Sequence, residues 1–221
     1  MRLAQNDGWA SLGSYLHGAG FVLSKGSADV MLAEDDRNRE VIRPLFTGQD
    51  LNSLAVLVPQ RWVIDFGEMS EDQARAYPAP WRHVETCVRP ERSRQDPSKY
   101  PRMVYEWWKH WNARPRLYSR MRSRDRVAVI ARVSRTLMPT IAPADAVFTD
   151  KVVVFTGEVL EDLAVASSSL MSTWAIRYGT SMRSDPTFTP RAVSDTFPRP
   201  PLADISAAVE VATAYTKCER R

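Results

Sequence analysis

The 221-residue sequence has few of the residues from which metal sites and disulfide frameworks are built. It holds three histidines, which stand apart at His17, His83 and His110, and two cysteines, Cys87 and Cys218. Neither set has the spacing of zinc ligands, and two distant thiols are typical of a protein kept in a reducing cytoplasm. We therefore predict no metal site, two free thiols and a cytoplasmic location.

Several motifs are also missing. The sequence has no glycine-rich phosphate loop, no Rossmann fingerprint and no recognisable serine, histidine and aspartate triad. No apolar run approaches the roughly 18 residues of a membrane helix, and the N-terminus lacks the pattern of a secretory signal. These absences predict no catalytic residue, no cofactor bound by this chain and no membrane association. They favour a binding module over an enzyme.

The sequence does contain a basic block. From Arg89 to Arg135 it has 14 Lys and Arg against 4 Asp and Glu, whereas the rest has 16 against 22. The block therefore carries +10 and the remainder −6. Arginine dominates the block, and its guanidinium suits bidentate contacts with phosphates and guanine edges. Such a block favours a nucleic-acid partner, although a solvated surface is the alternative interpretation.

Apolar spacing predicts a mixture of helices and strands. We expect strands at 61–67, 126–133, 146–148 and 151–155, and helices at 28–32, 160–178 and 203–215. Ser70 and Gln73 form a capping-box pattern at another helix start. Trp107 and Trp111 are expected on one helix face, packed in the core. No regular strand–helix–strand rhythm is visible, so the predicted fold class is α+β with small sheets and a C-terminal helix.

Four stretches, taken in order, resemble the region after the catalytic motifs in type IIG restriction–modification adenine-specific DNA methyltransferases. No single stretch is diagnostic, but the final TFPRPP is fairly specific. The stretches are Gly20–Leu23 with Ala28–Leu32 and Val41–Asn52, Arg61–Arg92, Trp107–Trp108 with Arg114–Arg116, and Ala131–Pro139 with Val147–Phe155 and Ser167–Pro201.

The resemblance implies a target-recognition domain and not a whole enzyme. The Phe-x-Gly-x-Gly motif for S-adenosylmethionine and the Asn-Pro-Pro-Tyr catalytic motif are absent, and Pro200–Pro201 follows Arg199 instead. S-adenosylmethionine would bind a methyltransferase core that acts in trans or belongs to a longer chain. We expect residues 1–55 to be a connector, 56–200 the recognition domain and 201–221 a C-terminal helix.

The implied function is sequence-specific binding of double-stranded DNA for adenine-N6 methylation. Arginines in the basic block would contact phosphates, and side chains on loops between rigid strands would read bases. The alternative interpretations are fold-forming ion pairs for Arg132 and a polar hairpin corner for Asp150–Lys151. The candidate DNA-binding residues are Arg116, Arg120, Arg124, Arg132, Ser134, Arg135, Asp150, Lys151, Arg177 and Arg183.

Two other functions remain open at this stage. One is a small metal-dependent nuclease that uses Asp65, Glu68 and Lys151, which divalent-metal-dependent cleavage would reveal. The other is a protein-interaction subunit that docks on a methyltransferase through the N-terminal segment and the terminal helix. Co-purification with a methyltransferase, without DNA binding in its absence, would identify the second.

Overall fold

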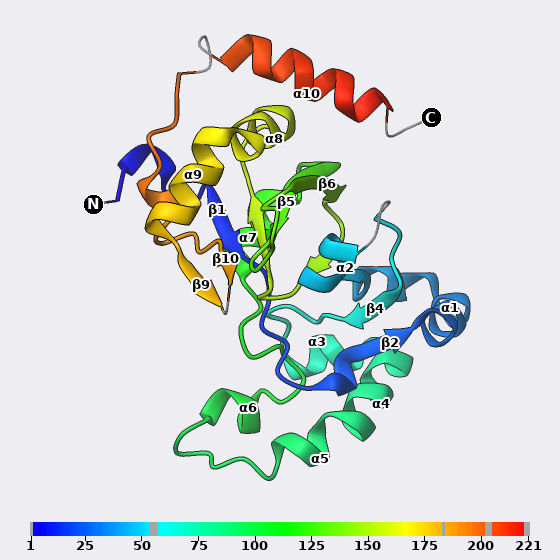
Figure 1. Ribbon diagram of the computed structural model, residues 1–221. Helices are drawn as coiled ribbons and strands as arrows, with labels where there is room; N and C mark the ends of the chain where they lie inside the picture. Colours follow the sequence, from blue (N-terminus) through cyan, green and yellow to red (C-terminus); the bar gives the residue numbers. More distant parts are fainter. Residues whose placement is uncertain (1, 54–56, 183, 202–204, 219–221) are drawn as a thin grey trace. The chain divides into compact units, whose positions relative to one another are not determined.

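The computed structural model describes residues 2–53, 57–182, 184–201 and 205–218, and the chain forms two compact units (Figure 1). The sheet unit comprises Met1–Gly13, Thr47–Leu57 and Leu117–Arg221, and the tryptophan unit comprises Ser14–Phe46 and Val58–Arg116. Each unit draws on residues from both sides of position 55. The expected division of the sequence into 1–55, 56–200 and 201–221 stays a prediction. The two compact units are defined by contacts in space, and each is discontinuous in sequence.

An antiparallel sheet organises the sheet unit, with the strand order β1-β8-β5-β6. Its strands are β1 (Ala10–Leu12), β5 (Arg126–Ala131), β6 (Pro139–Pro143) and β8 (Val152–Phe155). All of β8 and all but the first residue of β5 are buried, as their continuous apolar sequences predict. The predicted strands near 126–133 and 151–155 are confirmed. Val147–Phe148 forms β7, but β8 pairs with β1 and β5 and not with β7.

Helices and one hairpin complete the sheet unit. They are η1 (Ala4–Asn6), α2 (Gly48–Ser53), α7 (Pro115–Met121), whose first two residues belong to the other unit, α8 (Val159–Ser167), α9 (Ser169–Tyr178), η4 (Ser194–Thr196), α10 (Ser206–Cys218), and the hairpin of β9 (Thr180–Met182) and β10 (Asp185–Thr187). The terminal helix was predicted. The single helix expected at 160–178 is wrong, because Ser168 has an extended backbone and caps α9 by accepting a hydrogen bond from the Met171 amide at 3.1 Å.

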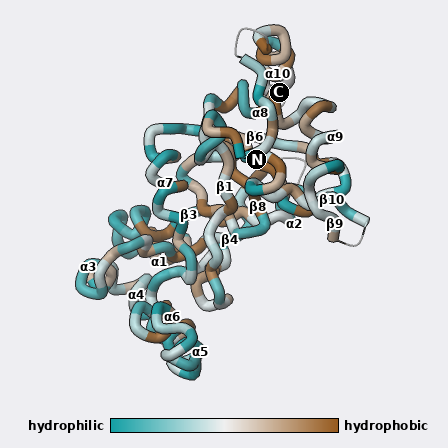
Figure 2. Tube along the Cα trace, turned by 90° about the vertical axis from the view of Figure 1, so that its left-hand side faces the viewer, coloured by the Kyte–Doolittle hydropathy of each residue, from teal (hydrophilic) through white to brown (hydrophobic). Residues whose placement is uncertain are grey.

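The core of the sheet unit lies between the sheet and α9. Trp9, Phe155, Phe188 and Phe197 are all less than 5% exposed and belong to one apolar cluster, against which Trp174 packs. Figure 2 shows the concentration of hydrophobic residues along the strands of this unit, in contrast to the hydrophilic helices α3 and α5 of the tryptophan unit. Such a core makes the sheet a rigid base for the loops at its ends.

The tryptophan unit contains a smaller antiparallel arrangement in the order β2-β4-β3. Its elements are η2 (Ala19–Phe21), β2 (Val22–Ser24), α1 (Lys25–Glu34), η3 (Asp36–Glu40), β3 (Ile42–Phe46), β4 (Arg61–Ile64), α3 (Glu71–Arg75), α4 (Pro78–Cys87), α5 (Arg89–Arg92) and α6 (Pro101–Tyr105). The capping box of Ser70 and Gln73 is confirmed at the start of α3. The described residues mix helices with small sheets, which confirms the α+β class.

Three tryptophans form the centre of this unit. The ring centroids of Trp81 and Trp107 are 4.9 Å apart, and those of Trp107 and Trp108 are 5.9 Å apart. The predicted core role of Trp107 is confirmed, since only 8% of it is exposed. The predicted shared helix face with Trp111 is wrong, because α6 ends at Tyr105 and both tryptophans lie in the turns that follow.

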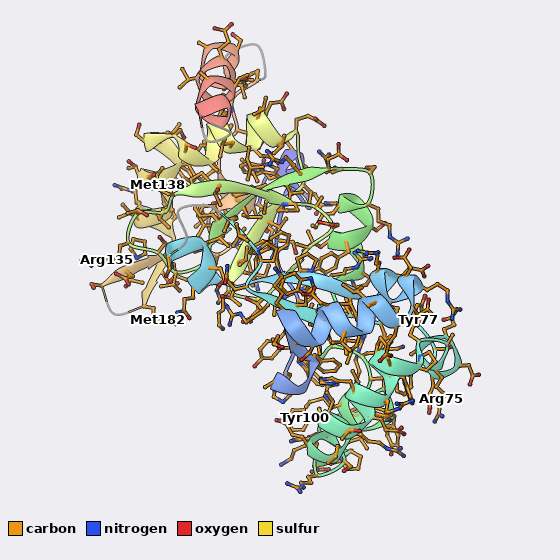
Figure 3. All side chains as sticks on the ribbon, turned by 90° about the vertical axis from the view of Figure 1, so that its right-hand side faces the viewer. Arg75, Tyr77, Tyr100, Arg135, Met138 and Met182 are labelled. Atoms are coloured by element: carbon orange, nitrogen blue, oxygen red, sulfur yellow. The ribbon has the colours of Figure 1, made fainter. Side chains whose placement is uncertain are left out.

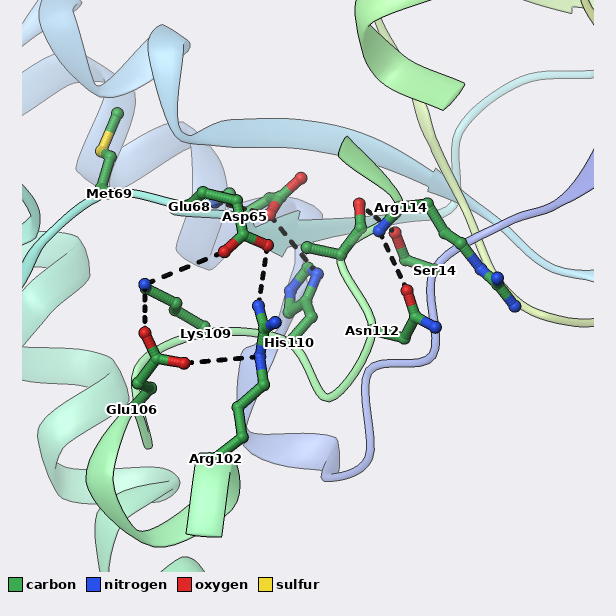
Figure 4. A network of polar contacts seen from close by, with 12 residues as sticks. Ser14, Asp65, Glu68, Met69, Arg102, Glu106, Lys109, His110, Asn112 and Arg114 are labelled. Carbon is green, nitrogen blue, oxygen red and sulfur yellow. Dashed lines mark hydrogen bonds and ion pairs between the residues drawn. The ribbon is translucent and has the colours of Figure 1, made fainter. Parts of the chain in front are cut away.

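A polar network runs beside these rings (Figure 4). Glu68 pairs with Arg102 at 2.7 Å, and Lys109 pairs with Glu106 at 2.5 Å. His110 is buried, with Nε2 2.9 Å from the Ile64 carbonyl oxygen and Nδ1 3.4 Å from Asp65.

Burial is the largest influence on His110 and lowers its pKa. The carboxylates of Asp65 and Glu68 are thus already engaged within this unit.

Candidate nucleic-acid interface

Loops gather at the end of the sheet where β5 ends and β8 begins. The segment Arg132–Leu137 leaves β5, and the Arg132 amide donates to the carbonyl oxygen of Lys151 at 2.8 Å. Lys151 lies in the turn Thr149–Lys151 that precedes β8. We call this segment, this turn, the β9–β10 hairpin and α2 together the loop surface. Two separate segments are therefore joined by a backbone hydrogen bond at one end of a buried sheet.

The hairpin is attached to the same segment. The Ser134 amide donates to Pro186 at 3.3 Å, Val133 bridges to Thr187, and the Phe188 amide donates to the Arg132 carbonyl oxygen at 2.7 Å. All three residues of β9 are exposed. The hairpin thus projects from a fixed base while its outer strand faces solvent.

Glycine is needed where α9 turns into this hairpin. A Cβ at Gly179 would lie 2.4 Å from the carbonyl oxygen of Ala175 and 2.9 Å from that of Thr187. Real Cβ atoms do not approach backbone oxygens so closely, so any side chain would displace either the helix end or β10. Gly179 therefore determines the position of the hairpin.

Three predicted cations have exposed side chains, two of them on the loop surface and the third, Arg177, in the helix that leads into its hairpin. Arg135 is exposed in the segment after β5 (Figure 3), and Arg177 is exposed at the end of α9, close to the ring of Tyr178. Lys151 has a side chain that is 62% exposed and pairs with Asp150 at 2.7 Å. This pair can open toward a phosphate at little cost, because an exposed ion pair contributes little stability.

The other two predicted residues here are less accessible. Ser134 is only 6% exposed, and its hydroxyl oxygen is 3.4 Å from both the amide and the hydroxyl oxygen of Thr136. Arg132 is half-buried, and its Nε atom has no hydrogen-bond partner among the described residues. Ser134 therefore shapes the segment from within. The buried Nε–H group of Arg132 therefore remains available as a hydrogen-bond donor among the described residues.

The remaining predicted arginines are found elsewhere. An Arg120 guanidinium nitrogen donates to the Gly8 carbonyl oxygen, and Arg124 donates to that of Gly157 at 2.5 Å and pairs with Glu158 at 3.5 Å. These contacts are at the end of the sheet where β5 begins. The six residues of β5 separate the two ends by roughly 20 Å. Arg116 is exposed in the first turn of α7.

The structure thus brings together Arg132, Ser134, Arg135, Asp150 and Lys151, places Arg177 at the end of the helix that leads into the hairpin, and places Arg120 and Arg124 at the opposite end of the sheet. Arg183 lies outside the described residues. For every one of these residues, contact with DNA stays a prediction.

Sequence reasoning missed α2, which it assigned to a connector. The side chain of Asn52 in α2 donates to the Val133 carbonyl oxygen at 3.0 Å. A Cβ at Gly48 would lie 2.8 Å from the Lys151 carbonyl oxygen, so the start of α2 packs directly on the turn. The spacing of Thr47 and Asp50 was the available signal, because it resembles a capping box.

The described residues offer few side chains that could together bind a metal ion. Among the described residues, no group of three or more His, Cys, Asp or Glu side chains is placed to hold a metal ion. Asp65 and Glu68 belong to the tryptophan unit, whereas Lys151 belongs to the sheet unit. None of the helices in the described part of the chain is long and apolar enough to cross a membrane.

Comparison with known proteins gives a consistent result. Residues 11–201 match the family model described as MmeI, target recognition domain. The fold is similar to a solved structure of the type IIL restriction-modification enzyme MmeI in complex with DNA, with a TM-score of 0.73 and 14% sequence identity. This similarity covers 94% of the present chain but only 27% of the length of the matched chain. No curated protein matches the sequence.

Proposed function

This chain belongs to the MmeI target recognition domain family, and from that premise we propose that it binds double-stranded DNA and reads a specific base sequence for a restriction–modification enzyme. The membership confirms the resemblance to a restriction–modification target-recognition region. The matched structure contains DNA bound to an enzyme of this kind. In our proposal the loop surface of the present chain faces the DNA.

The observation that carries the proposal is the grouping of exposed cations on loops that a buried sheet holds in place. Arg135 and Lys151 come from two segments that a backbone hydrogen bond joins, and Arg177 lies at the end of the helix that leads into the hairpin. Cations of this kind contact phosphates and fix the register of a protein on the duplex. Base edges are then read by neighbouring side chains whose backbone is rigid.

From the same premise we make a more specific proposal about the methylation reaction. We propose that the methylated base is adenine at N6 and that S-adenosylmethionine binds a methyltransferase core outside these 221 residues. The chain would work with that core in the cytoplasm, either in trans or as part of a longer polypeptide. Incubation of the chain with labelled S-adenosylmethionine and DNA should transfer no methyl group, whereas addition of a cognate core should restore transfer.

The DNA-binding proposal is tested by fluorescence anisotropy with random-sequence duplexes across a salt series. We expect log affinity to fall linearly with log salt concentration, because each phosphate contact releases counterions. Arg135→Ala and Arg177→Ala should each reduce the slope by about 1. Arg191→Ala is the matched control, since Arg191 is exposed in the same unit but outside the loop surface. Absence of binding at low salt would refute the proposal.

A further inference from the structure

The exposed side chains of α2 are uncharged, unlike the cations of the neighbouring segments. Gln49, Asn52 and Ser53 are all exposed, and their spacing of three and four residues places them on one face of the helix. The one charged residue of α2, Asp50, is only 8% exposed. The solvent face of this helix therefore consists of two carboxamides and a hydroxyl, with no charge.

This short helix is held rigidly at its start. The amide and hydroxyl of Thr47 both donate to Asp50 Oδ2, at 2.7 and 2.8 Å, and the Asp50 amide is 3.4 Å from the Thr47 hydroxyl oxygen. Gly48 is buried against the turn that carries Lys151. Six residues alone would not keep a stable helix in water, so these contacts determine where its side chains point.

The helix is also fixed to the segment that carries Arg135. Asn52 donates to the Val133 carbonyl oxygen at 3.0 Å, whereas Gln49 and Ser53 are exposed on the same face of the helix. The Gln49 carboxamide has no hydrogen-bond partner in the described part of the chain. Figure 3 shows α2, in cyan, on the same side of the sheet unit as Arg135 and Met182.

We propose that α2 is a base-reading helix of this domain and that Gln49 reads an adenine in the major groove. A carboxamide presents one donor and one acceptor to N7 and N6 of adenine, a pair that only an A·T base pair offers in that arrangement. Ser53 supplies an adjacent hydrogen bond, and Asn52 is a positioning residue. The cations Arg135 and Lys151 on either side contact the phosphates. The inference rests on the proposed function, because it requires DNA on the loop surface.

The test is selection of binding sites from a random duplex library by the full 221-residue chain, followed by sequencing. The wild-type chain should select a motif that contains at least one strongly preferred adenine. Gln49→Ala should reduce the preference at one such position by roughly 5- to 100-fold and leave the other positions unchanged. Its salt dependence of binding should equal that of the wild type, because no phosphate contact is lost.

Two further variants make the test specific. Gln49→Arg should change the preference at the same position from adenine to guanine, because arginine binds guanine O6 and N7. Gln5→Ala is the matched control: Gln5 is an exposed glutamine of the same unit, located before β1 and distant from α2 along the sheet. This control should select the wild-type motif.

The outcomes separate this inference from the proposed function. If the wild type selects a motif and Gln49→Ala and Gln49→Arg both select the same one, α2 does not read bases, while the DNA-recognition function stands. If the wild-type chain binds DNA but selects no motif, or does not bind at all, both the proposed function and this inference are wrong. Loss of preference spread evenly over all positions would also overturn the assignment of Gln49.

Discussion

Two buried charged side chains are held chiefly by hydrogen bonds to neutral groups. Asp162, 1% exposed, accepts from the Trp9 indole at 2.6 Å and from the Gly157 amide at 2.7 Å. Arg92, also 1% exposed, donates to the carbonyl oxygens of Leu16, His17, Trp107 and Lys109 at 2.6 to 3.2 Å. Each therefore joins segments that are distant in sequence, at the cost of a buried charge.

Burial raises the pKa of Asp162 to about 6 from its ordinary 3.8. The folded state thus holds the proton more tightly than the unfolded state, so the contribution of Asp162 to stability is full below about pH 4 and is lost as the pH rises to about 6. We predict that Asp162→Asn, which cannot ionise, gains stability relative to the wild type by up to about 3 kcal/mol between pH 4 and pH 7.

Urea unfolding of both proteins at a series of pH values measures this difference. A constant difference between their free energies of unfolding would show that Asp162 does not titrate in this range.

Burial is also the main reason that the pKa of Arg92 falls to about 10, so the guanidinium remains charged at neutral pH. Arg92→Ala should destabilise the tryptophan unit by about 3 kcal/mol or more, because the carbonyl groups lose their donors. Tryptophan fluorescence during denaturation reports mainly on this unit, since it contains five of the seven tryptophans. Arg94→Ala, at an exposed position of the same turn, should change stability by less than about 0.5 kcal/mol. Equal effects of the two substitutions would contradict the account.

At the scale of elements, the helix break at Ser168 shows how one side chain separates two helices. The hydroxyl of Ser168 donates to the Val165 carbonyl oxygen at 2.7 Å and accepts from the Met171 amide at 3.1 Å. It therefore ends α8 and begins α9. The direction of α9 in turn determines where Gly179 and the hairpin begin.

Ser168→Ala removes this cap and should destabilise the sheet unit by about 1 kcal/mol. Ser169→Ala is the control, because Ser169 is the exposed first residue of α9. Chemical denaturation followed by circular dichroism compares the two. A loss of stability in Ser169→Ala as large as that in Ser168→Ala would show that the cap is not responsible.

Elements with strong local signals could be predicted from the sequence. The apolar run of β8 and the capping box at Ser70 each determine their own structure, and both are confirmed. The break at Ser168 could not be predicted, because a serine inside an apolar helical pattern is compatible with either one helix or two. The position of α2 could not be predicted for another reason. Its place beside Val133 and Lys151 depends on contacts across about 80 to 100 residues of sequence.

At the scale of the whole molecule, the chain divides the basic block between its two units. Arg92 and Lys109 are buried in the tryptophan unit. Arg124 is bound to a carbonyl group at one end of the sheet, and Arg135 is exposed at the other. The cations of the block therefore differ in exposure and in the contacts that they make, although they are neighbours in sequence. The predicted residues that do come together, from 132 to 151, were chosen because they lie on strands or on the loops between them, and the ends of paired strands necessarily meet.

We propose that DNA binds at the end of the sheet where β5 ends. Amide hydrogen exchange of the full chain, with and without a duplex that it binds, locates the bound DNA on the chain. We expect slower exchange in the presence of DNA at 47–53, 132–137, 149–151 and 177–182, and no change around α7 or at 122–126. Protection confined to α7 and 122–126, or to the tryptophan unit, would contradict this proposal.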